Sequence, residues 1–230
     1  MEFTLLGAAL LGIAAALATL RIERVRGTTD RKDLIDIVLG ATGSGLAVGR
    51  VAAMVLQGTN PITHPLDLFF IRGGVDTGFA ALGSLAYLAW TARHDFWPTL
   101  DLLAPAGIAG LAGWQAGCLL RSACAGTTTS VPWAITLPGS TIERHPVEIY
   151  AAILLLGGAV ALVALRTKAP PGVIASASLV IAGGVRLMTE PLRLGLGADP
   201  GPWYMTGVAV GLISFSIRVI AARSRNIPDS

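Results

Sequence analysis

The sequence predicts an all-α integral membrane protein with seven transmembrane helices, organised as a single domain over residues 1–230. Apolar residues make up 53% of the chain and charged residues only 13%, whereas roughly a quarter of the residues in soluble domains are charged. The mean hydropathy is high, at +0.67. Seven apolar windows reach the length of about 17 to 25 residues that a helix needs to cross a bilayer. These windows are 3–20, 34–56, 74–92, 101–120, 147–165, 173–190 and 202–220.

The first window is expected to remain in the mature protein as a membrane span. A secretory signal peptide has basic residues before its apolar run. Here Glu2 precedes the run, and the basic residues Arg21, Arg24 and Arg26 follow it.

The distribution of basic residues among the loops predicts the topology. Loops on one side hold ten of them: Arg21, Arg24, Arg26, Arg31, Lys32, Arg93, Arg166, Lys168, Arg223 and Arg225. Loops on the other side hold four: Arg72, Arg121, Arg144 and Arg193. Because cytoplasmic loops are enriched in Lys and Arg, we expect the N-terminus outside and the C-terminus in the cytoplasm. The basic pI of about 9.2 then follows from topology and does not indicate nucleic-acid binding.

The longest connection, 121–146, is expected on the outer side. It contains Pro132-Trp133 and Pro138-Gly139, residues typical of turns and of the membrane interface. Long loops in compact domains are usually functional or disordered, and this composition favours a functional loop. Cys118 and Cys124 flank its start, where they either form a disulfide in an oxidising compartment or stay separate as small apolar residues.

Glycine is abundant, and many of the 28 glycines fall at a spacing of four residues. Small residues at this spacing let helix backbones approach closely in lipid. Examples are Gly45/Gly49, Gly74/Gly78 and Gly113/Gly117. Close packing explains most of them, and the remainder could line a lipid groove. Gln115 lies within the last pair, where its amide either joins two helices or orients a lipid headgroup.

Three charged residues, Arg50, Arg186 and Glu190, lie within or at the edge of predicted spans. A charge in a membrane helix costs about 2.5 to 3.5 kcal/mol, so such residues usually face the bundle interior or a polar cavity. Arg186 and Glu190 are four residues apart and can share a helix face, and Arg193 follows at the outer edge. These residues either form structural ion pairs or present a guanidinium to a phosphate.

Several motifs together resemble the prolipoprotein diacylglyceryl transferase family. The family's D-F-x-A-P-x-x-P-x-G-x-G-x-G-R-x-G-N-F pattern aligns without a gap with 101–119, and its R-H-P-S-Q-L-Y pattern aligns with 144–150. Its R-F-x-x-E-F-x-R pattern aligns with 186–193. Shorter matches in the same order are Gly49-Arg50, Gly73-Gly74 and Pro132-Trp133. The resemblance covers almost the whole chain and implies the family's seven-span fold in the bacterial cytoplasmic membrane.

The chain departs from the family where the resemblance implies chemistry. Gly78 aligns with the motif histidine, Gln115 with an arginine and Cys118 with an asparagine. Further along the chain, Ala123 aligns with a glutamate and Ala182 with a tyrosine. Losing an acid or base costs about 10² to 10⁴-fold in rate, and losing a charge-stabilising donor about 10² to 10³-fold. The same reaction carried by the same residues is therefore not expected.

The resemblance implies a phospholipid partner, most naturally phosphatidylglycerol, and a lipobox-containing preprolipoprotein as acceptor of the diacylglyceryl group. The implied phosphate ligands are Arg50, Arg186 and Arg193, and His145 is the weak candidate for proton transfer. The residues expected to line the cavity are Gln115, Gly78, Gly117, Cys118, Gly126 and Glu190. No cofactor or metal is expected, because the sequence has no metal-ligand spacing or nucleotide motif. The competing hypotheses are a non-catalytic lipid-binding partner and, with less support, a small transporter.

Overall fold

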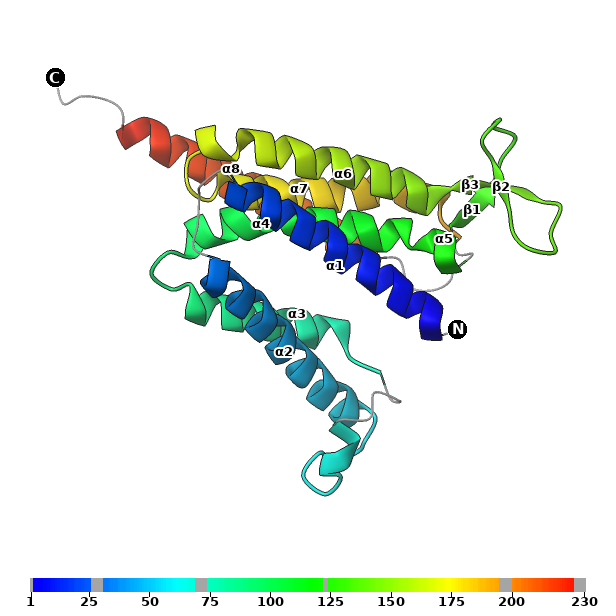
Figure 1. Cartoon of the computed structure of the whole chain (residues 1–230), viewed down its shortest axis with the longest axis horizontal. Coiled ribbons are helices and arrows are strands. Elements are labelled where there is room, and N and C mark those ends of the chain that lie inside the picture. Colours follow the sequence, from blue (N-terminus) through cyan, green and yellow to red (C-terminus); the bar gives the residue numbers. More distant parts are fainter. Residues whose placement is uncertain (1, 26–30, 69–73, 122–123, 195–199, 226–230) are drawn as a thin grey trace. The chain divides into compact units, whose positions relative to one another are not determined.

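The computed structural model describes residues 2–25, 31–68, 74–121, 124–194 and 200–225. The chain forms two compact units. The larger unit comprises Met1–Gly27 and Trp97–Ser230, and the smaller unit comprises Thr28–Phe96. Figure 1 labels their helices and strands.

The smaller unit is a pair of packed helices, α2 (Arg31–Leu56) and α3 (Thr77–Thr91), with a 3₁₀ turn, η1 (Pro65–Leu68), between them in sequence. A Cβ atom added at Gly45 would lie 2.8 Å from the carbonyl oxygen of Ala80, and one added at Gly49 would lie 2.7 Å from that of Asp76. The two glycines therefore allow close backbone contact, as small residues do between membrane helices.

The start of α3 is capped by Asp76, whose carboxylate accepts a hydrogen bond from the backbone N–H of Phe79 at 3.0 Å. A capping carboxylate satisfies a backbone donor that the helix leaves unpaired. Asp76 therefore acts as a helix-start residue in this structure.

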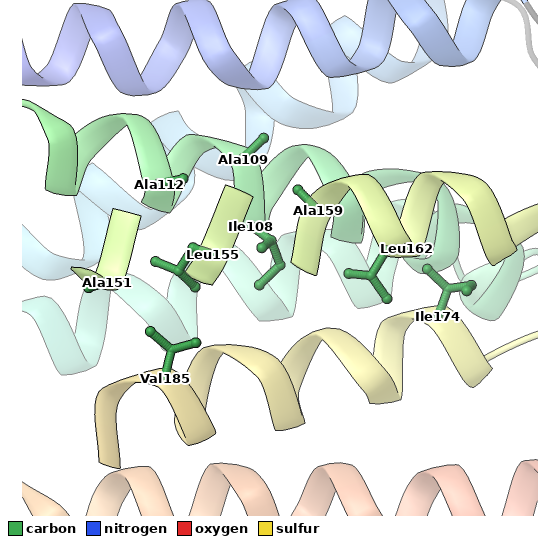
Figure 2. Close-up of a cluster of buried hydrophobic side chains, with 9 residues drawn as sticks. All are labelled: Ile108, Ala109, Ala112, Ala151, Leu155, Ala159, Leu162, Ile174 and Val185. Atoms are coloured by element: carbon green, nitrogen blue, oxygen red, sulfur yellow. The ribbon is translucent and has the colours of Figure 1, made fainter. Parts of the chain in front are cut away.

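The larger unit is a bundle of helices. Its α-helices are α1 (Glu2–Val25), α4 (Phe96–Ala116), α5 (Cys118–Arg121), α6 (Val147–Leu165), α7 (Val173–Thr189) and α8 (Gly201–Arg225), and its 3₁₀ turns are η3 (Arg166–Lys168) and η4 (Glu190–Leu192). Helix α7 packs between α6 and α8. Figure 2 shows the core, to which α4, α6 and α7 contribute. Its residues are Ile108, Ala109, Ala112, Ala151, Leu155, Ala159, Leu162, Ile174 and Val185.

Small residues set the close approach of α1 to α4. A Cβ at Gly113 would lie 2.5 Å from the carbonyl oxygen of Leu11, and the Cβ of a residue replacing Gly117 would fall against Ala8. Backbone contact at this distance excludes any side chain. The glycine run of 101–120 is thus a helix-packing surface, as the sequence predicted for most of its glycines.

Five helices in the described part of the chain are long and apolar enough to cross a membrane. They occupy Leu34–Leu56, Phe96–Leu120, Val147–Lys168, Val173–Leu192 and Gly201–Ser224. Two shorter apolar helices occupy Gly7–Ile22 and Gly78–Thr91, in the windows expected to supply the remaining spans. The protein is a mostly helical, multi-pass membrane protein, and seven spans with the N-terminus outside stay a prediction.

The predicted outer loop contains a small antiparallel sheet that the sequence analysis did not anticipate. Its strands are β1 (Ala125–Thr128), β2 (Ile135–Thr136) and β3 (Glu143–Pro146), in the order β1-β3-β2. Thr128 and Ile135 both pair with Arg144 across β3. Cys118 and Cys124 form a disulfide, which resolves the alternative left open by the sequence and ties α5 to the start of β1.

One buried carboxylate fixes α7 against α4. Asp101 in α4 accepts hydrogen bonds from the backbone N–H groups of Gly172, at 2.6 Å, and Ala175, at 2.7 Å. Gly172 immediately precedes α7 and has a φ of 90°, a conformation that suits glycine. The carboxylate of one helix thereby caps the N-terminus of another, where a negative charge is favourable.

Substitution of Asp101 by asparagine should destabilise the larger unit by about 1 to 3 kcal/mol, because the amide nitrogen would face a backbone donor and leave it unsatisfied. Thermal unfolding in detergent measures the change. The matched control is Asp95→Asn, at an exposed position, which should melt like wild type. Equal melting temperatures for the two variants would contradict the capping role.

Candidate functional site

A cavity of about 220 Å³ lies among α4, α6, α7 and α8. Most of its wall is apolar and includes Leu111 and Leu155. Polar side-chain atoms come from Gln115 on α4, Arg186 on α7, and Trp203 and Tyr204 on α8. An apolar cavity with a few converging polar groups is the usual form of a small-ligand site.

Gln115 connects two charged residues of opposite sign. The side chain is only 2% exposed, so its amide must be hydrogen-bonded within the protein. The hydrogen-bond network sets the amide orientation. The nitrogen donates to Oε2 of Glu148, and the oxygen accepts from Nη1 of Arg186 at 3.0 Å and Nη2 at 2.5 Å. The amide is thus an interhelical hydrogen-bond bridge and also part of the cavity wall.

Glu148, in the first turn of α6, is paired with Arg193. Nη1 of the arginine lies 2.8 Å from Oε1, and Nη2 donates to Oε2 at 2.9 Å. This is a two-pronged pair of the kind that guanidinium geometry favours. Both side chains are mostly buried, with exposed fractions of 22% for Arg193 and 17% for Glu148. Nε of Arg193 lies 3.6 Å from Oε2 of Glu190, so this cation is flanked by two carboxylates.

Arg186 has a different environment. Its guanidinium hydrogen-bonds to the neutral amide of Gln115, and no carboxylate in the described part of the chain lies within the 4 Å of an ion pair. A guanidinium has five N–H donors. The oxygen of Gln115 accepts one hydrogen bond from Nη1 and one from Nη2 of Arg186. Glu148 and Glu190 also attract this guanidinium, from beyond ion-pair distance.

Arg50 lies in the smaller unit and is 7% exposed. Nε and Nη2 donate to the backbone oxygen of Asp67 at 3.1 and 2.7 Å, and Nη1 donates to that of Gly74 at 2.9 Å. These contacts fix the connection between α2 and α3. Gly78, also in this unit, lies beside the carboxylate of Asp76.

His145, on β3, belongs to a chain of polar side chains. Its Nδ1 lies 3.3 Å from the hydroxyl of Tyr150, which accepts a hydrogen bond from Nε1 of Trp133 at 2.7 Å. Arg144 donates to the backbone oxygen of Gly126 at 3.1 Å. These contacts hold the strands and the start of α6 together, so His145 has a clear role in orienting this loop.

The remaining predicted cavity residues have other neighbours. Gly117 packs against Ala8, and Gly126 packs against the backbone of Leu192. Cys118 is in the disulfide, and Glu190 lies beside Arg193. Gln115 is the member of this group that lines the cavity described above, and for the others the cavity role stays a prediction.

Glu148, Trp203 and Tyr204 were not singled out from the sequence as site residues. Glu148 could have been found, because it is a charged residue at the edge of the 147–165 window and such residues are functional candidates. Tyr204 carried no comparable signal, since tyrosine near the end of a span is commonly an interface anchor.

The Glu148–Arg193 pair should show energetic coupling. Replacing either residue by glutamine should cost about 1 to 3 kcal/mol, and the double variant should cost about 1 to 2 kcal/mol less than the sum of the single changes. Denaturant or thermal unfolding in detergent measures all four proteins. Glu148→Gln combined with Lys168→Gln, an exposed change in η3 beyond the other end of α6, should be additive. Additivity in the Glu148–Arg193 cycle would contradict the pairing.

Comparison with known proteins agrees with the sequence motifs. Residues 3–222 match the family model for prolipoprotein diacylglyceryl transferase. A phosphatidylglycerol–prolipoprotein diacylglyceryl transferase of Glaesserella parasuis is 30% identical over 195 residues, 79% of this chain and 71% of the relative. Relatives with the same name from Pseudomonas aeruginosa and Methylibium petroleiphilum are 28% identical over 195 residues (80% of this chain, 73% of the relative) and 29% identical over 215 residues (84% and 81%). The chain therefore belongs to the prolipoprotein diacylglyceryl transferase family.

Proposed function

We propose that this protein binds an anionic glycerophospholipid, phosphatidylglycerol in the first place, with the lipid phosphate on Arg186. The observation that carries the proposal is the environment of Arg186: the residue lines a cavity in an apolar bundle, and its guanidinium hydrogen-bonds to the neutral Gln115. A cation within a membrane helix is costly unless a counter-charge is near. Glu148 and Glu190 attract Arg186 only from beyond ion-pair distance. A phosphodiester would supply a directly bonded counter-charge, and it matches the forked geometry of the guanidinium.

The size of the cavity supports a headgroup ligand. Pockets for drug-sized molecules measure about 300 to 1,000 Å³, and this cavity measures about 220 Å³. It is therefore suited to the phosphate and glyceryl part of a lipid, with the acyl chains extending into the surrounding bilayer. Arg193 already holds Glu148 with two nitrogens, so in this proposal it supports the site next to Arg186.

The proposed reaction is transfer of the diacylglyceryl group to a thiol, as the names of the relatives state for those proteins with prolipoprotein as acceptor. The thiol loses its proton to a base, and its sulfur attacks a glycerol carbon. The bond between that carbon and the phosphate oxygen breaks, and its electron pair leaves with glycerol phosphate. Negative charge grows on the departing phosphate, and Arg186 would stabilise it, since fixed donors act most strongly where charge develops.

The setting is a seven-span protein of the bacterial cytoplasmic membrane with its N-terminus outside. His145 is the histidine proposed to take the thiol proton. Nδ1 of His145 is in contact with the hydroxyl of Tyr150. Nε2 would therefore accept the proton, unless the contact between Nδ1 and Tyr150 breaks first.

A second candidate is a lipid-binding partner that does not perform the transfer. It is favoured by one observation: Gly78 and Gln115 stand where the family motifs place a histidine and an arginine. This candidate shares the lipid site with the first and differs from it in lacking the chemical step.

Arg186→Ala should weaken phosphatidylglycerol binding about 10-fold to 100-fold, because each hydrogen bond to a charged group contributes about 1.5 to 3 kcal/mol. Mass spectrometry of lipid retained by the purified protein, with titration of added phosphatidylglycerol, measures the effect. The control is Lys168→Ala, which removes an exposed basic residue and should keep the lipid. An Arg186→Ala protein that retained its lipid would overturn the phosphate assignment.

The transfer step is tested with purified protein, phosphatidylglycerol and a lipobox peptide. Release of glycerol phosphate with lipidation of the peptide cysteine is the expected result. A protein that binds the lipid but releases no glycerol phosphate would instead support the second candidate.

A further inference from the structure

Tyr204 lies in the first turn of α8, on the wall of the cavity that contains Arg186. Its backbone is held closely against α7: a Cβ at Gly183 would lie 2.9 Å from the carbonyl oxygen of Tyr204. A side chain at that position on α7 would push the two helices apart. Gly183 therefore allows Tyr204 to approach the cavity, and the neighbouring Ala182 leaves room beside it.

The hydroxyl of Tyr204 is a polar group on the wall of this cavity. Within the described part of the chain, its hydroxyl has no hydrogen-bond partner, whereas the hydroxyl of Tyr150 bridges Trp133 and His145. Tyr204 is half-buried at the cavity wall, so its hydroxyl can bond either to water or to a ligand in the cavity. The adjacent Trp203 is 79% exposed, as expected of an interface anchor, so the two neighbouring aromatic residues differ in their surroundings.

We infer that the hydroxyl of Tyr204 donates a hydrogen bond to the same phosphoryl group that Arg186 binds. The inference rests on the proposed function, and it adds a substrate-contacting residue from α8 to the cation on α7. A phosphodiester has two unesterified oxygens, so a guanidinium and a hydroxyl from adjacent helices can each take one. Gln115 cannot fill this second position, because its nitrogen donates to Glu148 and its oxygen faces Arg186.

The test compares Tyr204→Phe with wild type for binding of phosphatidylglycerol and of diacylglycerol, each supplied in detergent micelles. The change removes one oxygen atom and leaves the ring. A single neutral hydrogen bond contributes about 0.5 to 1.5 kcal/mol, so phosphatidylglycerol binding should fall about 2-fold to 10-fold. Diacylglycerol has no phosphate, and its binding should not change. Tyr87→Phe is the matched control, because it removes a hydroxyl from α3 in the smaller unit.

The outcomes separate this inference from the proposed function. If Tyr204→Phe binds both lipids as wild type does, or loses both equally, the hydroxyl is not a phosphate ligand and the inference is overturned. Arg186→Ala is measured in parallel. If it loses phosphatidylglycerol while Tyr204→Phe keeps it, the cavity remains a phosphate site and only the role of Tyr204 is wrong. If Arg186→Ala keeps the lipid, the proposed function itself fails.

Discussion

The positive charge of Arg186 is the constraint on which the rest of the site depends. An arginine in an apolar bundle must be hydrogen-bonded and close to a counter-charge. Gln115 meets the first requirement, and its own nitrogen is bound by Glu148. Glu148 in turn is held by Arg193. The contacts therefore form a connected network that starts at Arg186 and includes Gln115 on α4, Glu148 on α6 and Arg193 after α7.

This network of contacts requires closely packed helices, and small residues at the helix contacts allow that close packing. Gly113 and Gly117 bring α1 against α4, and Gly183 brings α8 against α7. Asp101 fixes the opposite end of α7 by capping it from α4. Because the helix axes are set by backbone contact and a buried cap, long side chains such as that of Arg186 can meet their partners reproducibly.

Much of the fold could be predicted from the sequence, because apolar windows and small-residue spacing are local patterns. The intramembrane charges were also recognised, but their partners were not. Arg186 and Glu190 were expected to share a helix face, yet α7 ends at Thr189 and Glu190 begins a 3₁₀ turn. Pro191 has no N–H to continue the helix. The pairing of Arg193 with Glu148 depends on how two distant segments meet, which residue spacing does not encode.

The neutrality of Gln115 explains how Arg186 can remain available to a ligand. A carboxylate in its place would form an internal ion pair with Arg186 and compete with a lipid phosphate. Glu148 is such a carboxylate, and it lies on the other side of the amide. Gln115 therefore connects the two charges through hydrogen bonds while keeping them apart, and Arg193 neutralises Glu148 instead. Glutamine at the position of the family's arginine thus removes one positive charge from the cavity and, under the proposed function, leaves Arg186 to bind the phosphate.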